Sequence, residues 1–206
     1  MTALILTIDC GNSRLKWGLH GSAGWRAQGM HDYADLQGFA GQLRAQPRAD
    51  SMVAVNVAGP QVGEAVAAVV ATLGIKQHWV KSQSAQYGVR NLYDHPEQLG
   101  ADRWAALIGA RTLHGGACLV VCAGTATTVD ILDAEGGFQG GLILPGFGLM
   151  YRALESGTAG LKVPTGEVRD FPTNTSDALM SGGTDAIAGA IERSLRRLRE
   201  HTGLDP

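Results

Sequence analysis

The chain has 206 residues, of which 45% are apolar and 17% are charged, and its formal net charge is −2. This composition excludes an intrinsically disordered chain and predicts one or two domains with a buried core. A net charge so close to zero gives no basic surface of the kind that nucleic acid requires, so no nucleic-acid partner is expected. A small acidic metabolite is the more natural partner.

Three cysteines, Cys10, Cys118 and Cys122, lie in apolar, strand-like runs. Their odd number and their setting favour reduced, buried thiols over disulfides, which predicts a cytoplasmic protein. The N-terminal apolar run stops at Asp9 and is too short for a signal peptide or a membrane span. No other run approaches about 18 uninterrupted apolar residues, so no membrane segment is expected.

The first half predicts alternating strands and helices. Short apolar runs that end at turn residues predict strands over residues 4–8, 15–19, 52–57 and 77–80. Residues 62–73 have apolar side chains at helical spacing and are followed by Gly74. A second apolar stripe runs from Asp102 to Leu113 and stops at two glycines. This alternation is typical of an α/β fold.

The second half repeats the opening of the first. A buried strand is expected over residues 117–122, leading to Gly124-Thr-Ala, and another strand over residues 127–132. The strands at residues 4–8 and 15–19 flank Gly11-Asn-Ser in the same way, so the two halves read as a repeat. Later elements are a strand over residues 137–143, a helix over residues 148–156 and a final helix capped by Thr184.

Two glycine-containing turns carry the residues that a nucleoside triphosphate requires. Phosphate binding needs backbone amides directed at the phosphate oxygens, a residue small enough for close approach, and a carboxylate for Mg²⁺. Residues 9–13 and residues 124–130 each supply such a set, and no P-loop or dinucleotide-binding sequence is present. Lys16 lies on the returning strand, where its ammonium can reach a phosphate. Taken alone, the first turn is equally consistent with an ordinary β-turn.

Four motifs resemble, in order and spacing, those of the type III pantothenate kinases, a Bvg accessory factor-like family of the acetate and sugar kinase, Hsp70 and actin superfamily. They are Asp9-x-Gly-Asn-Ser-x-x-Lys16, Gly100-Ala-Asp-Arg103, Gly124-Thr-Ala-Thr-Thr-Val-Asp130 and Gly140-Gly-Leu-Ile-Leu-Pro-Gly146. The resemblance implies an α/β fold of two duplicated ribonuclease H-like (actin-like ATPase) halves, which we divide into residues 1–115 and 116–206. It also implies a homodimer in which the second halves form the interface.

The same resemblance implies an activity: ATP-dependent phosphorylation of pantothenate to 4'-phosphopantothenate, the first step of coenzyme A biosynthesis. It implies that ATP is held by Asp9, Cys10, Gly11, Asn12, Ser13, Arg14, Leu15, Lys16 and Thr125. It implies that pantothenate contacts Tyr93, Gly100, Ala101, Asp102, Arg103 and Thr175, with Asp102 as the proton acceptor. Mg²⁺ is expected near Asp9 or Asp130.

A carboxylate at residue 102 suits this chemistry independently of the resemblance. The substrate hydroxyl must be aligned with the γ-phosphorus, and a neighbouring carboxylate orients the O–H group and accepts its proton. Arg103 can hold a charged oxygen beside it. Without the surrounding motifs, Asp102 and Arg103 would be a helix N-terminal acid and a surface arginine. Tyr93 would be a packing aromatic residue and Thr175 a helix cap.

The sequence departs from the family pattern at two places. The strand before Gly124 commonly ends in an Asp that helps to bind an activating K⁺ or NH₄⁺ ion, and Cys122 stands there in this chain. Because a thiol is a poor ligand for a hard cation, a K⁺ site of the family's usual kind is not expected. Family members also usually continue into another strand and a glycine-rich turn near the adenosine, so the second half is expected to be truncated.

Two alternatives stay open at this point. The first is a non-catalytic regulatory accessory factor of the same fold, which the missing adenosine segment favours, whereas the retained Asp9, Asp102 and Asp130 favour catalysis. The second is a kinase of another small hydroxylated acid, because substrate choice depends on the shape of the pocket.

Overall fold

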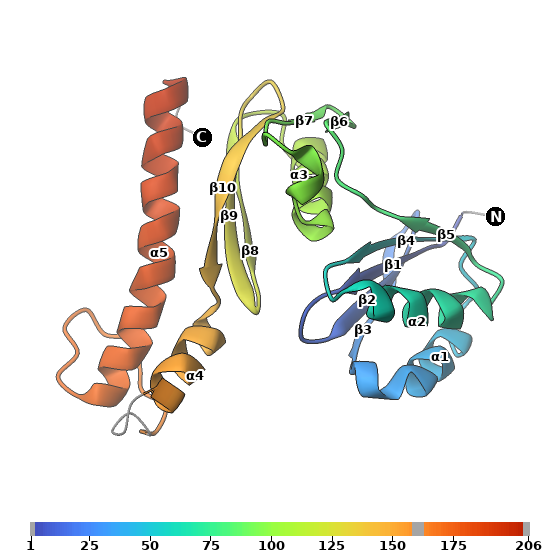
Figure 1. Ribbon diagram of the computed structural model, residues 1–206, viewed down its shortest axis with the longest axis horizontal. Helices are drawn as coiled ribbons and strands as arrows, with labels where there is room; N and C mark the ends of the chain where they lie inside the picture. The colour runs from blue at the N-terminus through green and yellow to red at the C-terminus, as the bar shows by residue number, and fades with distance from the viewer. Residues whose placement is uncertain (1–2, 158–162, 204–206) are drawn as a thin grey trace. The chain divides into compact units, whose positions relative to one another are not determined.

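A computed structural model describes residues 3–157 and 163–203 of the chain. The chain forms two compact units, Met1–Ser82 with Glu97–Ala105 and Gln83–Pro96 with Ala106–Pro206. Figure 1 shows the helices and strands of each unit. The division of the repeat into residues 1–115 and 116–206 stays a prediction.

The first unit is built on a five-stranded sheet in the order β3-β2-β1-β4-β5. The strands β1, β2 and β3 form an antiparallel meander, while β4 and β5 run parallel to β1. Their bounds are Ile5–Cys10, Leu15–Gly21, Gly24–His31, Ser51–Asn56 and Lys76–Trp79. A three-stranded meander continued by two parallel strands is the arrangement of a ribonuclease H-like half.

The helices α1 (Leu36–Arg44) and α2 (Pro60–Ala71) cover one face of this sheet (Figure 1). Leu6, Ile8 and Cys10 of β1 belong to one buried cluster with residues of both helices. Because side chains alternate along a strand, Thr7 and Asp9 point to the opposite face. The core therefore fixes the direction of Asp9. This residue begins residues 9–13, the first of the two turns predicted to bind phosphate, which we call the first phosphate turn; residues 124–130 contain the second.

The second unit has a five-stranded sheet in the order β6-β7-β10-β9-β8. The strands β8, β9 and β10 form an antiparallel meander, as β1, β2 and β3 do. The parallel strand β7 pairs with the third strand of this meander, β10, whereas in the first sheet β4 pairs with the first strand, β1. The bounds of β6 to β10 are Ala85–Gln86, Val89–Asn91, Cys118–Ala123, Ala126–Leu132 and Gly137–Pro145. The predicted α/β fold with two related halves is confirmed.

Three helices and two short 3₁₀ helices complete the described part of the chain. The helix α4 packs against α5 and β9, and α5 packs against β8 and β9. The helix α3 contributes its first turn to the first unit and its remaining residues to the second. The bounds of η1, η2, α3, α4 and α5 are Tyr33–Asp35, Pro96–Gln98, Ala101–Leu113, Phe147–Gly157 and Thr175–Thr202. Within residues 3–157 and 163–203, no helix has the length and apolar character needed to cross a bilayer.

The prediction that Thr184 caps the last helix is wrong. The helix begins at Thr175, and the side chain of Asn174 caps it by accepting the N–H of Asp177 at 3.0 Å. The Thr184 hydroxyl donates to the Met180 carbonyl one turn earlier, so it is satisfied inside the helix. Glycine weakens a helix, but a Cβ on Gly183 would lie 2.7 Å from the Phe147 ring, so tertiary packing explains the glycine there.

Candidate functional site

The first phosphate turn joins β1 to β2 in the first unit. In the strand ladder Asp9 pairs with Lys16, and Lys16 Nζ lies 3.3 Å from Asp9 Oδ2. Both side chains are exposed, and they line an open hollow of about 610 Å³ on the sheet face opposite α1 and α2. An exposed ion pair of this kind contributes little to stability. The Lys16 ammonium can therefore leave the Asp9 carboxylate and bind a phosphate instead. Lys16 lies in β2, the returning strand on which the sequence places it.

The start of α3 lies at the same edge of the sheet as this turn. The N–H of Val57, just after β4, donates to the carbonyl of Cys10 at 3.0 Å. A Cβ on Gly100 would lie 3.9 Å from Val57 Cγ1. The structure thus brings two of the predicted motifs, residues 9–16 and 100–103, to the carboxyl ends of β1 and β4. Ligands of open α/β sheets bind at this end of the strands.

Asp102 is held at the first turn of α3. Its Oδ1 accepts the N–H of Arg103 at 2.8 Å, and a Cβ on Gly100 would lie only 2.6 Å from that oxygen. Residue 100 must therefore be glycine if the carboxylate is to keep this position. Ser82 fixes the preceding segment by donating from its hydroxyl to the Leu99 carbonyl at 2.6 Å.

Arg103 is only 5% exposed, so the alternative interpretation of it as a surface arginine is wrong. A buried guanidinium needs partners for its charge and its N–H groups, and Arg103 is not without a partner in the folded chain. Its burial is consistent with the predicted role of holding a charged oxygen next to Asp102.

The second phosphate turn, at Gly124 and Thr125, joins β8 to β9 in the second unit. The Gly146 N–H donates to the Thr125 carbonyl at 2.9 Å, and a Cβ on Gly146 would lie 2.0 Å from the Gly124 carbonyl oxygen. The motifs at residues 124–130 and 140–146 are therefore in contact, and only glycine fits at the contact.

Replacing Gly146 with alanine is expected to lower the free energy of unfolding by about 1–3 kcal/mol, because backbone atoms must move to make room for the methyl group. The midpoint of urea unfolding, followed by circular dichroism, measures this change. The matched control is Gly182→Ala in α5, where no atom lies within 4 Å of the added Cβ and helix propensity favours alanine. Equal stability of the two variants would contradict the contact.

The other predicted residues of the second unit have different settings. Tyr93 packs its ring against Phe138 at a centroid distance of 5.1 Å, and its N–H donates to Asn91 Oδ1. Thr175 is the first residue of α5, and because Asn174 is the cap, the interpretation of Thr175 as the cap is wrong. Contacts of Tyr93, Thr175 and Thr125 with a ligand stay predictions.

Asp9 and Asp130 differ as candidate carboxylates for Mg²⁺. Asp130 lies in β9 and is fully buried, whereas Asp9 is open to solvent. Within the described residues, no three His, Cys, Asp or Glu side chains gather into a metal site. Mg²⁺ that accompanies a nucleotide takes most of its ligands from phosphates and water, so a single exposed carboxylate fits this role. Asp9 is the better candidate.

The three cysteines are free thiols, as the sequence predicts, but only Cys10 is buried. Burial, together with the neighbouring Asp9, raises the pKa of the Cys10 thiol to about 12, so it stays protonated beside the phosphate turn. Cys122 is exposed, and the prediction of a buried strand over residues 117–122 is wrong at its end. Residues 118–120 of β8 are partly buried, whereas residues 121–123 are exposed, so the strand loses its cover toward its end.

Tyr33 is a residue of this site that the motifs do not indicate. Its hydroxyl donates to the Gly11 carbonyl in the phosphate turn at 2.6 Å. The side chains of Asp32 and Asp35 cap η1 and α1 on either side of it and so fix its position. Burial, followed by the effects of Cys10 and Asp9, raises the pKa of Tyr33, so the hydroxyl keeps its proton and can donate.

Tyr33→Phe is expected to raise the Michaelis constant for ATP about 2- to 10-fold and to leave kcat nearly unchanged. The physical reason is that the substitution removes only the hydrogen bond that holds the turn, while the ring stays in place. Initial rates over a range of ATP concentrations measure the effect. Tyr87→Phe, at a side chain that is 75% exposed, is the control. An unchanged Michaelis constant would show that the turn does not need this bond.

Comparisons with known proteins place these motifs in one family. A family model described as type III pantothenate kinase matches residues 5–197. A type III pantothenate kinase from Azoarcus sp. (strain BH72) is 51% identical and aligns over 95% of this chain and 75% of its own length. One from Acidovorax ebreus is 52% identical, over 98% of this chain and 82% of its own length.

Solved structures share the fold at low sequence identity. A protein assigned to the Baf family of transcriptional activators, from Campylobacter jejuni, has a TM-score of 0.60 at 23% identity, over 91% of this chain and 78% of its own. A protein assigned as a 2-dehydro-3-deoxygalactonokinase, from Sinorhizobium meliloti, has a TM-score of 0.57 at 13% identity, over 90% and 79%. These structures support the fold, and the closer sequence matches identify the group: the chain belongs to the type III pantothenate kinase family.

Proposed function

We propose that this protein phosphorylates pantothenate with ATP, giving 4'-phosphopantothenate in the first step of coenzyme A biosynthesis. The observation that supports the proposal is the edge of the first sheet, where the exposed Asp9–Lys16 pair follows β1 and Gly100, at the start of the helix that carries Asp102, lies beside Val57 after β4. The chain is about half identical to type III pantothenate kinases. The Asp9–Lys16 turn suits the phosphates of ATP, and the carboxylate of Asp102 suits the hydroxyl that is phosphorylated.

Each residue of this edge has a proposed role. The backbone of residues 11–14 and the ammonium of Lys16 bind the phosphates, while Asp9 orients Mg²⁺ or a water molecule bound to it. Asp102 orients the hydroxyl of pantothenate and accepts its proton as the bond to phosphorus forms. ATP supplies the phosphoryl group. The transition state is loose, so positioning by these residues matters more than the basicity of Asp102.

A coupled assay of ADP release with a panel of hydroxylated acids tests the proposal. Pantothenate is expected to give the highest kcat/KM, and the product is expected to be phosphorylated on its primary hydroxyl. A higher kcat/KM for another acid would assign the protein as a kinase of that acid. Binding of pantothenate or ATP without any turnover would instead favour a regulatory accessory factor.

Activity is expected to respond only weakly to K⁺, with a change in kcat/KM below about twofold, because Cys122 supplies no hard oxygen ligand. In the ladder Cys122 lies opposite Thr128, whose buried hydroxyl has no hydrogen-bond partner within the described part of the chain. Cys122→Asp would place a carboxylate next to that hydroxyl and is expected to increase the response. Titration with KCl at constant ionic strength, against a large organic cation, measures it. Strong activation of the native chain by K⁺ would contradict the expectation.

We further propose a cytoplasmic homodimer. Free thiols and a metabolic substrate suit the cytoplasm. Large apolar side chains of the second unit are exposed, which is typical of a surface that is covered in an assembly: Val121, Ile143, Leu149, Leu154, Val168 and Phe171. Sedimentation equilibrium distinguishes a dimer from a monomer, and a monomeric native chain would contradict the proposal.

A further inference from the structure

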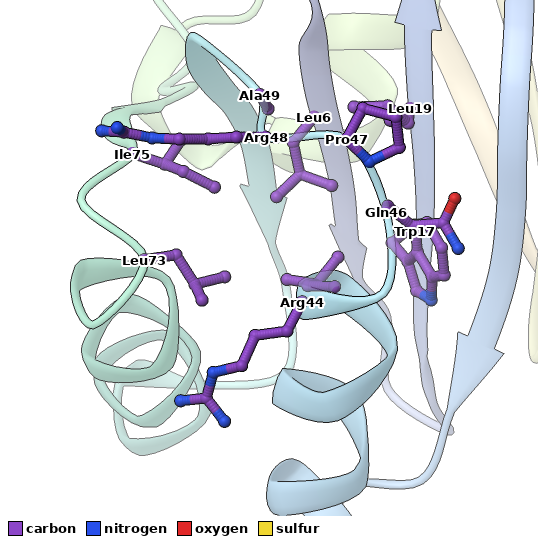
Figure 2. Close-up of a pocket in the computed structure, with 11 residues that line it drawn as sticks. Leu6, Trp17, Leu19, Arg44, Gln46, Pro47, Arg48, Ala49, Leu73 and Ile75 are labelled. Carbon is purple, nitrogen blue, oxygen red and sulfur yellow. The ribbon is translucent and has the colours of Figure 1, made fainter.

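The first unit contains a second hollow, on the helix-covered face of its sheet. It lies between β1, β2, the last turn of α1 and the segment that follows α2, and Figure 2 shows the side chains around it. Its volume is about 170 Å³. An apolar cavity of about 150 Å³ in another protein stays dry and binds benzene, so this space suits one small ring or a branched chain.

The walls of this pocket are mainly apolar. Leu6, Leu73 and Ile75 face the same space in Figure 2, and Trp17 and Leu19 complete the wall on the side of β2. Pockets of this composition bind the apolar body of a small molecule and use a few polar groups to orient it.

Two residues of the pocket wall, Trp17 and Arg48, are held in place by hydrogen bonds. The Trp17 indole N–H donates to Gln42 Oε1 at 3.3 Å, and a Cβ on Gly29 would lie 2.8 Å from the indole nitrogen. The ring is thus fixed from two sides. On the other side, Arg48 Nη2 donates to the Gly74 carbonyl at 2.8 Å and joins the two loops that border the pocket.

The two charged side chains that line the pocket are both positive. Arg44 and Arg48 lie at its lower and upper margins in Figure 2, and none of the described residues that line it is acidic. The nearest acid in the sequence, Asp50, accepts the N–H of Leu4 at 2.7 Å with its carboxylate. The lining therefore favours an anion over a cation or a neutral ligand.

We propose that this pocket binds a small carboxylate with a compact apolar body, of the size of cyclohexanecarboxylate, with the carboxylate held by Arg44 at one margin of the pocket. A guanidinium is the cation best suited to a carboxylate, because it donates two parallel hydrogen bonds. Leu6 lies on the opposite face of the sheet from Asp9 and Lys16, so the ligand leaves the phosphate turn free. The site is independent of the proposed kinase activity.

Titration of the full chain with cyclohexanecarboxylate tests the proposal, with the indole N–H resonance of Trp17 as the reporter. The resonance is expected to shift to saturation. The uncharged amide of the same shape, cyclohexanecarboxamide, is expected to bind about tenfold more weakly, and cyclohexylmethylamine more weakly still. No saturation by about 10 mM carboxylate, or equal affinity for the acid and the amide, would overturn the proposal.

Arg44→Gln is expected to reduce the affinity for the carboxylate about tenfold, to the level of the amide, and to leave the affinity for the amide unchanged. Arg44 is exposed, so the variant is expected to fold. Arg26→Gln, at an exposed arginine of β3 outside the pocket, is the matched control. Ala49→Val narrows the pocket and is expected to weaken both ligands. Equal losses in the Arg44 and Arg26 variants would show that no specific contact is made.

Discussion

Asp102→Asn is expected to lower kcat by at least about 100-fold, while the Michaelis constant for ATP changes by less than about twofold. Asparagine keeps the shape of the side chain, and its oxygen can still accept the Arg103 N–H. It cannot take the hydroxyl proton, so the loss falls on the transition state. Initial rates for kcat, together with an equilibrium titration of nucleotide binding, separate the two effects.

A control for this variant removes a carboxylate elsewhere. Asp170→Asn changes an exposed aspartate of the second unit and is expected to leave both constants unchanged. The stability of the Asp102 variant is expected to fall by no more than about 1 kcal/mol, from the loss of a favourable charge at the N-terminus of α3. Turnover close to that of the native chain would remove Asp102 from the mechanism.

Asp9→Ala has the second largest expected effect, a rise of at least about tenfold in the Michaelis constant for Mg·ATP. The substitution removes the one acidic side chain among residues 9–16 and leaves Lys16 without its partner at 3.3 Å. The dependence of activity on Mg²⁺ concentration is expected to shift to higher concentrations, since a ligand of the ion or of its water shell is lost. Rates measured over a grid of Mg²⁺ and ATP concentrations show the shift.

Asp9→Ala is expected to leave the fold intact, so a change in its kinetics can be assigned to the phosphate turn. The Asp9–Lys16 pair is exposed and contributes at most about 1 kcal/mol, so the unfolding midpoint is expected to stay near that of the native chain. Glu64→Ala, at an exposed position of α2, loses the same charge without touching the turn and is the control. An unchanged Mg²⁺ dependence in the Asp9 variant would assign the metal to other ligands.

The sequence predicts those parts of the fold whose pattern is local. The runs that became β1, β2, β8 and β9 are short, apolar and bounded by turn residues, so each strand is visible by itself. The edge strand β3 (Gly24–His31) carries glycine, arginine and glutamine and is mostly open to solvent, so it shows no apolar pattern. Its ladder with β2 holds it in place, and that ladder is a property of the folded sheet.

In the candidate site, too, residues in local motifs can be predicted from the sequence, whereas residues placed by long-range contacts cannot. Asp9, Lys16 and Asp102 stand in motifs and can be found from the sequence. Tyr33 cannot, because its contact with Gly11 spans 22 positions of the chain and depends on β3 and η1 to bring the hydroxyl back to the turn. The tyrosine lies between two aspartates that cap short helical turns, which is a weak signal for an ordered loop and no signal for its partner.

The order of the strands along the chain has a consequence for synthesis on the ribosome. Every strand of the first sheet lies between Ile5 and Trp79, so that sheet has all its partners early. In the second sheet β7 pairs with β10, so Arg90 has no partner until Gly137 has been added to the chain. At the usual rate of translation this interval is about 2 to 10 seconds, in which the first sheet can fold and the second cannot close. In the first sheet Ile5 of β1 likewise pairs with Ser51 of β4, 46 positions later. Each sheet therefore leaves one inner strand edge unpaired for a similar time, and the edge of β7 is unpaired after all strands of the first sheet have been made.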